Sequence, residues 1–242
     1  MKMSPLAALT ALALTTFTFA DPVEAQTSPV PWPLGCPVPA TVANDGTTVL
    51  GFTPCQPFVT DPNGTPLYIP FCTQVFILLA PGDVYTSYWN QNDGMGLQVP
   101  PGVYLVNGVP YDLGAANCAL RPLGAPYVGA TRHVELCAPG HGGEVYVLVA
   151  SASTTTGIAL GCGQVFPLDY DALMFQSLYN PAIFGNFVGT LDANGRTNAP
   201  AISVPAQPFL SGFTFQLGYI TLDAQAPCGV GALCAPVATT VI

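Results

Sequence analysis

Short apolar runs with alternating polar positions fill the chain, and Gly, Pro and Asn separate them. Between Phe213 and Tyr219 the apolar residues alternate with Thr, Gln and Gly, which is the period of a strand with one buried face. The same criterion predicts a first series of strands at 47–52, 56–60, 66–68, 74–79, 84–89 and 103–106. A second series is predicted at 132–136, 145–150, 156–160, 187–191, 201–204, 213–222 and 237–241.

Short strands at this spacing predict an all-β, disulfide-stapled protein of two immunoglobulin-like or jelly-roll-type β-sandwich domains. The first series places an N-terminal sandwich at 36–117 and the second a C-terminal sandwich at 118–242, after a Pro-rich lead-in at 26–35. Only the stretch 169–179 has room for one or two helical turns. No exact repeat relates the two halves, so we expect two unlike sandwiches.

The N-terminus has the pattern of a secretory signal peptide. Lys2 precedes an uncharged apolar run at 6–19, and small residues offer cleavage after Ala20 or after Ala25. The polar residues before Ala25 favour the second position. About 14 apolar residues fall short of the roughly 20 that span a bilayer. Residues 1–25 are therefore predicted to be removed from an exported chain that keeps no membrane span.

Charge is scarce in this chain, since only 7% of its 242 residues are charged. Removing residues 1–25 takes away Lys2, Asp21 and Glu24, which leaves 3 of the 4 Lys+Arg residues and 11 of the 13 acidic residues. So few cations argue against nucleic acid or an anionic membrane as a partner. Few groups remain that exchange protons near neutral pH, which also argues against most catalysis.

The cysteines predict four disulfides, because an exported chain with an even number of them favours bridges over metal or redox chemistry. The short loop between Cys228 and Cys234 could close on itself. Cys55 and Cys72 flank a turn at 61–64, and a type I turn with a Gly bulge puts Cys55 opposite Phe71, so this pairing needs a one-residue adjustment. The eight candidates are Cys36, Cys55, Cys72, Cys118, Cys137, Cys162, Cys228 and Cys234.

The remaining chemistry is limited. His133 is predicted on the strand face opposite its neighbours, His141 in a turn, and no third ligand completes a zinc site. Paired carboxylates serve glycoside hydrolysis, but such a pair straddles the sugar and usually comes from different elements. No serine elbow or phosphate loop is present. We therefore predict no cofactor, no metal and no catalytic residue; the carboxylates kept for an enzymatic alternative are Asp169, Asp171, Asp192 and Asp223.

Aromatic residues are the other notable group. An uncharged polar surface that carries aromatics suits contacts with protein or carbohydrate. Most of the aromatics should nevertheless be core. The core prediction covers Phe76, Trp89, Tyr104, Tyr146, Phe213 and Phe215.

Residues 79–104 resemble a known strand-loop-strand unit. The matching positions are Pro81-Gly82, Trp89, Asp93, Gly96, Val99-Pro100-Pro101-Gly102 and Tyr104. The pattern is similar to that of the bacterial intracellular proteinase inhibitor family and of the immunoglobulin-like insert of flagellar hook-capping proteins. The resemblance implies that Trp89 and Tyr104 are core aromatics on neighbouring strands joined through a turn at 93–96. It is specific for the fold unit, since Asn90 replaces the usual acid and no reactive loop is evident.

The C-terminal part resembles a β-sandwich domain at the end of many secreted bacterial proteins of unassigned function, through residues 166–171, 187–196, 202–205 and 210–216. Our leading hypothesis is a secreted, non-enzymatic structural or adhesive module of the bacterial envelope or extracellular matrix, which binds an envelope or extracellular protein or a glycan. The alternatives are a protease inhibitor, from the unit at 79–104, and a carbohydrate-active enzyme that uses two of the four aspartates.

Overall fold

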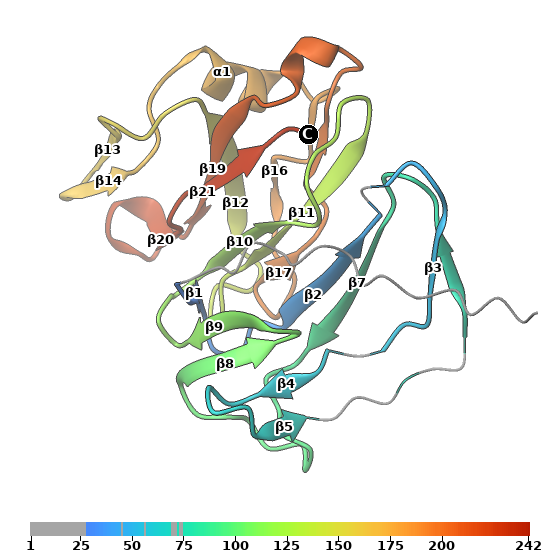
Figure 1. Cartoon of the computed structure of the whole chain (residues 1–242). Coiled ribbons are helices and arrows are strands. Elements are labelled where there is room, and N and C mark those ends of the chain that lie inside the picture. The colour runs from blue at the N-terminus through green and yellow to red at the C-terminus, as the bar shows by residue number, and fades with distance from the viewer. Residues whose placement is uncertain (1–27, 45, 56, 69–71, 73–74) are drawn as a thin grey trace, which may run out of the picture.

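The computed structural model describes residues 28–44, 46–55, 57–68, 72 and 75–242, so the predicted signal peptide lies outside the described residues. These residues form β-strands, one α-helix and two short 3₁₀ turns. The strands form two groups of sheets, with the N-terminal group at the bottom and the C-terminal group at the top of Figure 1. The all-β, disulfide-stapled fold is therefore confirmed. No helix within the described ranges is long and apolar enough to cross a membrane.

One long hairpin makes up much of the N-terminal unit. Its two arms form three antiparallel strand pairs, one after another with increasing distance from the predicted turn at 61–64. The pairs are β4 (Val59–Thr60) with β5 (Pro66–Tyr68), β3 (Leu50–Phe52) with β6 (Ile77–Leu79), and β2 (Val38–Ala43) with β7 (Val84–Trp89). The strand β4 also joins a five-stranded sheet with β1 (Val30–Trp32), β8 (Gly102–Val106) and β9 (Val109–Leu113).

The hairpin turn explains how Cys55 meets Cys72. The amide of Asp61 donates to the carbonyl of Thr65 at 3.0 Å, and Gly64 takes the positive φ of +84° that a Gly bulge needs. The register then shifts by one residue between β4 and β5. Cys55 therefore lies directly opposite Cys72, and their predicted disulfide is present.

The core of the N-terminal unit lies under β8 and β9. The rings of Trp89 and Tyr104 meet edge to face at 5.6 Å, and both are buried. This contact confirms the core position of both residues that the resemblance implied, but their strands are not neighbours in one sheet, since β7 pairs with β2 and β8 with β9 and β4. Tyr111 and Trp32 extend the same core with a second edge-to-face pair at 5.6 Å. Because β1 carries Trp32, part of the Pro-rich lead-in forms a strand of this sheet.

The C-terminal unit is a sandwich of two sheets. Tyr146 and Leu148 of one sheet and Val134 and Leu136 of the other fill the space between them. The first sheet contains β10 (Ala119–Pro122), β11 (Thr131–Cys137), β15 (Phe184–Gly185), β17 (Arg196–Thr197) and β18 (Ala201–Ser203). The second contains β12 (Val145–Ser151), β16 (Val188–Thr190), β19 (Thr214–Leu222), β20 (Val230–Leu233) and β21 (Val237–Thr240).

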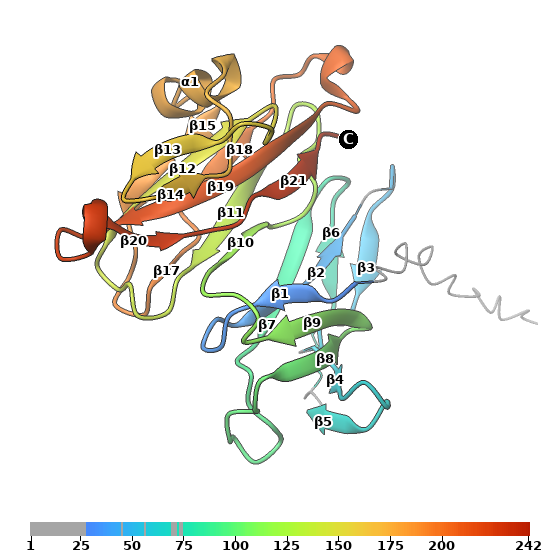
Figure 2. The ribbon, with the colours of Figure 1, turned by 90° about the vertical axis from the view of Figure 1, so that its left-hand side faces the viewer.

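A third layer covers the outer face of β12 and β19. It consists of the hairpin β13 (Ile158–Gly161) and β14 (Gln164–Phe166), followed by helix α1 (Ala172–Tyr179) inside the predicted helical stretch. Phe166, Leu168 and Met174 pack there against Val149. Gly218 makes the close approach possible, because a Cβ there would lie 3.1 Å from the Leu168 side chain. Figure 2 shows β13 and β14 in front of this sheet.

The other three disulfides are Cys36–Cys137, Cys118–Cys234 and Cys162–Cys228. The closed loop considered for Cys228 and Cys234 is therefore wrong. The strand β20 lies between these two residues, and its four residues span about 13 Å at 3.3 Å each, which exceeds the Cα separation of a disulfide. Four disulfides suggest an oxidising, extracytoplasmic environment.

All three arginines of the chain lie along the junction of the two units. Arg121 donates to the carbonyl of Pro39 at 2.8 Å, and Arg132 donates to the carbonyl of Gly82, so both reach from the C-terminal to the N-terminal unit. Arg196 pairs with Glu135 at 3.5 Å. Burial raises the pKa of Glu135. The few cations therefore join parts of the molecule to each other.

Four of the six aromatics predicted as core are buried: Trp89, Tyr104, Tyr146 and Phe215. Phe76 and Phe213 are not, with 65% and 41% of their surfaces exposed. Both residues stand at positions where the alternation of buried and exposed side chains predicts burial. Phe213 lies just before β19, where the sandwich opens, and Phe76 lies on a ribbon face that no other layer covers in the described residues.

Candidate binding site

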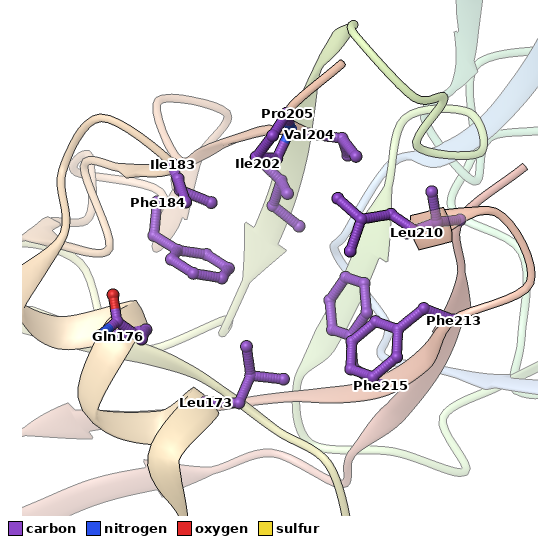
Figure 3. Close-up of a pocket in the computed structure, with 11 residues that line it drawn as sticks. Leu173, Gln176, Ile183, Phe184, Ile202, Val204, Pro205, Leu210, Phe213 and Phe215 are labelled. Atoms are coloured by element: carbon purple, nitrogen blue, oxygen red, sulfur yellow. The ribbon is translucent and has the colours of Figure 1, made fainter. Parts of the chain in front are cut away.

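An apolar pocket opens at the end of the C-terminal sandwich, between α1 and the two sheets (Figure 3). Its volume is about 180 Å³. Leu173 and Gln176 contribute from α1, and the side chains of Phe184 and Phe215 face the same space from opposite sheets. The other lining residues are Ile183, Ile202, Val204, Pro205, Leu210, Phe213 and Val241.

The local sequence explains why the pocket stays open. The strands β15 and β18 are only two and three residues long, so the first sheet ends early on this side. Pro208 then starts the 3₁₀ turn Pro208–Leu210, which carries Leu210 to the rim instead of continuing a ladder. The floor is built from core residues such as Ile202 and Phe215. The pocket is thus an unfilled end of the sandwich core.

Exposed aromatics lie on elements that also contribute lining residues. Phe209 is 78% exposed on the 3₁₀ turn that carries Leu210, and Phe213, which lines the pocket just before β19, is 41% exposed. On the solvent face of α1, Phe175 lies between Tyr170 and Tyr179, with ring centroids 4.7 and 6.3 Å away. All three rings are exposed. We call these five residues the aromatic rim.

The pocket offers shape and apolar surface but almost no hydrogen bonding. Gln176 is its only lining residue with a polar side chain. A cavity of about 150 Å³ lined by Leu, Ile and Phe binds a benzene ring, so this pocket has room for one ring or branched alkyl group. Hydroxyl groups buried here would lose their hydrogen bonds with water and find one partner at most.

The four aspartates kept for an enzymatic alternative do not share a groove. Asp169 and Asp171 bind loop residues next to Ser151, at the C-terminal end of β12. Asp192 and Asp223 follow β16 and β19, which both end beside Val145, the first residue of β12. The length of β12, roughly 20 Å at 3.3 Å per residue, separates the two pairs, which exceeds the spacing of glycosidase carboxylates.

Each aspartate is also occupied locally. Asp169 accepts five hydrogen bonds from residues 153–157, and Asp171 caps α1 by accepting from the amide of Met174 at 2.8 Å. The hydroxyls of Ser153 and Thr155 and the amides of Gly157 and Thr156 lower the pKa of Asp169 well below its usual range. Asp192 and Asp223 accept from backbone amides of their own turns.

The two histidines lie apart. His133 is exposed on β11 with Nδ1 3.1 Å from the carbonyl of Asn198, on the face opposite its buried neighbour Val134. His141 lies in a turn with Nδ1 2.9 Å from the Glu144 carboxylate, a partner that the sequence did not suggest. Within the described ranges, no three His, Cys, Asp or Glu residues gather as a metal site. All eight cysteines are in disulfides.

Sequence reasoning did not find the pocket. Its lining comes from six separate segments, and only Phe213 and Phe215 were singled out, as core. The one signal in the sequence is Gly212 directly before Phe213, since glycine interrupts strands. A scan of the chain against protein-family models gives no match, and a search of the curated proteins finds no similar sequence.

Proposed function

We propose that this protein is an exported, non-enzymatic adhesive module that binds another extracellular protein of the bacterial envelope or matrix. The contact face is the apolar pocket with its aromatic rim, and the partner inserts one apolar side chain of Leu or Phe size. The single observation that carries this proposal is an open pocket of about 180 Å³ with one polar residue among its lining residues and exposed aromatics on the elements that border it.

The size of the pocket supports a macromolecular partner. Sites for drug-sized ligands measure about 300–1,000 Å³, so this pocket is too small to enclose most of such a molecule. Burying one apolar side chain contributes only about 1.5–3 kcal/mol, which by itself gives weak binding. The aromatic rim extends the contact beyond the pocket, and Tyr and Phe are enriched in the buried centre of protein interfaces.

The polarity of the pocket favours protein over glycan among the two partner classes. A sugar inserted here would leave several hydroxyl groups without partners, at a cost of about 1–3 kcal/mol each. An apolar side chain has no such cost. The disulfide-rich fold, whose described residues contain no lysine, fits an exported binding module that is stabilised by its hydrophobic cores and disulfides rather than by ion pairs.

Methyl NMR can test this function directly. The purified protein, labelled at Ile, Leu and Val methyl groups, is titrated with the capped amides of leucine and phenylalanine and with neutral oligosaccharides. We expect the amides to shift the methyl signals of Leu173, Val204 and Leu210, with dissociation constants in the millimolar range that one buried side chain allows.

Two variants make the test specific. Phe213→Ala removes a partly exposed rim residue and should weaken binding of the amides at least tenfold. Met95→Ala removes a more exposed apolar residue far from the pocket and should have no effect. Shifts at these methyl groups with oligosaccharides but not with the amides would assign the pocket to glycan. No shift with any ligand would remove the pocket from the proposal.

A second candidate function is protease inhibition, favoured by one observation at the unit 79–104. The tip of this unit, between β7 and β8, presents Met95 and Leu97 with 82% and 62% of their surfaces exposed. The turn is closed by hydrogen bonds from Asp93 to Leu97 and from Gly96 to Asp93. Incubation with a panel of serine proteases decides the matter: full protease activity at stoichiometric protein rejects inhibition.

A further inference from the structure

The strands β3 and β6 form a two-stranded ribbon that leaves the main sheets. We use the name β3–β6 ribbon for the two strands with the adjacent residues Val49, Val75 and Phe76. Three residue pairs link the strands, and among the described residues neither strand pairs with any other. In Figures 1 and 2 the ribbon stands beyond β2 and β7, at the side of the N-terminal unit. No described strand therefore occupies either of its hydrogen-bonding edges.

The ribbon is apolar on both faces. On the inner face, the ring of Phe52 contacts that of Tyr85 at 5.4 Å and attaches the ribbon to β7. On the outer face, Val49, Phe76 and Leu78 are 58%, 65% and 65% exposed. Gly51 lies among them without a side chain, so that the ring of Phe76 can lie over its backbone, where a Cβ would overlap the ring.

The ribbon is held rigidly although its outer face is exposed. At one end the buried Asn44 donates its side-chain amide to the carbonyls of Thr48 and Leu79, at 2.8 Å each. At the other end the Cys55–Cys72 disulfide joins the two arms of the hairpin. A surface fixed in advance loses little conformational entropy when it binds. An isolated two-stranded ribbon of this kind is otherwise marginal in water.

Edge strands usually carry protection that this ribbon lacks. Natural proteins block open edges with lysine, charged residues or proline. The described residues contain no lysine, and no charged residue occurs between Asp45 and Asp61 or between Asp61 and Asp83. Thr47–Thr53 and Gln74–Leu79 are uncharged, free of proline and rich in β-branched and aromatic residues. These are the properties of segments that pair with copies of themselves.

We infer that the β3–β6 ribbon is a self-association site, where a second copy of this chain adds its own ribbon edge to edge and continues the sheet. The sequence of the strands selects the second copy as the occupant, because uncharged, proline-free segments rich in β-branched and aromatic residues pair with copies of themselves. The chain carries a formal net charge of −9, so two copies repel each other overall, and this repulsion is weakest where they approach across the uncharged ribbon.

Edge-to-edge pairing also gives hydrogen-bond partners to the backbone groups along the strand edge. A strand edge presents a row of amide and carbonyl groups that only another strand edge matches in full. Two identical ribbons related by a two-fold axis form a four-stranded sheet and place the same apolar residues of both copies side by side. This inference does not depend on the pocket at the other end of the molecule, and it gives an adhesive module a second, homotypic contact.

Sedimentation velocity of the purified protein over a wide concentration range tests the inference. We expect wild-type protein to shift from monomer toward dimer as concentration rises. Leu78→Lys and Phe76→Lys place a charge on the exposed outer face, where the fold tolerates it. They should weaken the dimer several-fold, since the two-fold axis sets like charges side by side on the joined sheet and lysine is a residue that natural edge strands use against such pairing. Val188→Lys, at a residue of comparable exposure (55% against 65%) on the edge strand β16, should leave association unchanged.

Unchanged thermal unfolding and circular dichroism must accompany these variants, so that lost association reports the interface and not the fold. A wild-type protein that stays monomeric at millimolar concentration overturns the inference, and so does equal weakening by Val188→Lys. Flotation with phosphatidylcholine vesicles adds one outcome: vesicle binding that Leu78→Lys abolishes, without dimerisation, would assign the face to a lipid surface. The rim variant Phe213→Ala should dimerise like wild type. Failure of the pocket proposal and failure of the self-association inference can therefore be told apart.

Discussion

Three aspartates organise the same five-residue turn at different places in the chain. In the turns that begin at Asp61, Asp93 and Asp192, one carboxylate oxygen accepts from the amides two and four residues ahead, at 2.8–2.9 Å. A glycine at the fourth position takes a positive φ in each case. A large share of the acidic residues is thus used to close turns, because a short carboxylate side chain can satisfy backbone amides that no ladder reaches.

Asp169 gives a pH prediction at this scale. Its folded pKa lies below the unfolded value near 3.8, so its ionised form stabilises the fold above that pH, and this stability is lost as pH falls below it. Asp169→Asn should lower Tm at pH 7 and flatten the loss of Tm between pH 4 and pH 2. Thermal scans across this range measure both effects. Asp223→Asn is the control, because the Asp223 carboxylate accepts one backbone hydrogen bond that the asparagine oxygen can still accept. Parallel Tm curves for Asp169→Asn and wild type would contradict the assignment.

Among the elements, α1 is short but has two roles. It covers Val149 of the second sheet with Met174, and it provides one wall of the pocket with Leu173. A helix of eight residues has little stability of its own and depends on its packing and its cap. Asp171 supplies that cap and also accepts from the amide of Ala152 at 2.7 Å, which ties the helix to the end of β12.

The loss of stability on removing this cap should therefore be measurable. Asp171→Ala should lower the free energy of unfolding by about 1 kcal/mol, the usual value of an N-cap, as measured by urea denaturation. It should also broaden the methyl signal of Leu173, because the pocket wall frays. Gln207→Ala is the matched control, since Gln207 stands at the cap position of the 3₁₀ turn without a side-chain bond and should change stability by less than 0.5 kcal/mol. Equal losses for both variants would reject the cap role.

Proline explains why the pattern missed three of the strands. The strands β2, β9 and β10 contain Pro39, Pro110 and Pro122, which argue against a central strand. In the fold each of these prolines lies on an edge strand or at a position that the neighbouring strand does not reach. The parallel strand β1, for example, pairs only with Tyr111–Leu113 of β9 and stops before Pro110, so no ladder bond from that nitrogen is needed there.

At the scale of the whole molecule, the two units are joined by covalent and polar links more than by charge pairs. The Cys36–Cys137 disulfide joins residues 101 positions apart and is buried in the N-terminal core. Arg121 and Arg132 add hydrogen bonds to backbone carbonyls of the N-terminal unit. A chain with three arginines can hold a large interface because each guanidinium has several donors for uncharged oxygens.

The disulfides should differ in their contribution to stability. In the chain-entropy model a loop of about 100 residues is worth about 4.7 kcal/mol and one of about 15 residues about 3 kcal/mol. The Cys36→Ala/Cys137→Ala variant should therefore lose about 1.7 kcal/mol more than Cys55→Ala/Cys72→Ala, whose cysteines are 17 positions apart. Urea unfolding of both variants and wild type gives the comparison. An equal or larger loss for the shorter loop would contradict the model.

The sequence by itself determined the β class, each of the thirteen predicted strands, the turn at 61–64 with its Cys55–Cys72 pair, and the scarcity of charge. These features depend on residues close together in the chain, where periodicity and turn chemistry act. The other three pairings of the cysteines and the positions of Phe76 and Phe213 were decided only by the tertiary structure. An alternating pattern shows that a strand has an apolar face, but whether another layer covers that face depends on where distant segments end. Phe215 is part of the sandwich core, while Phe213, two residues earlier and just before β19 begins, is 41% exposed at the open end of that core.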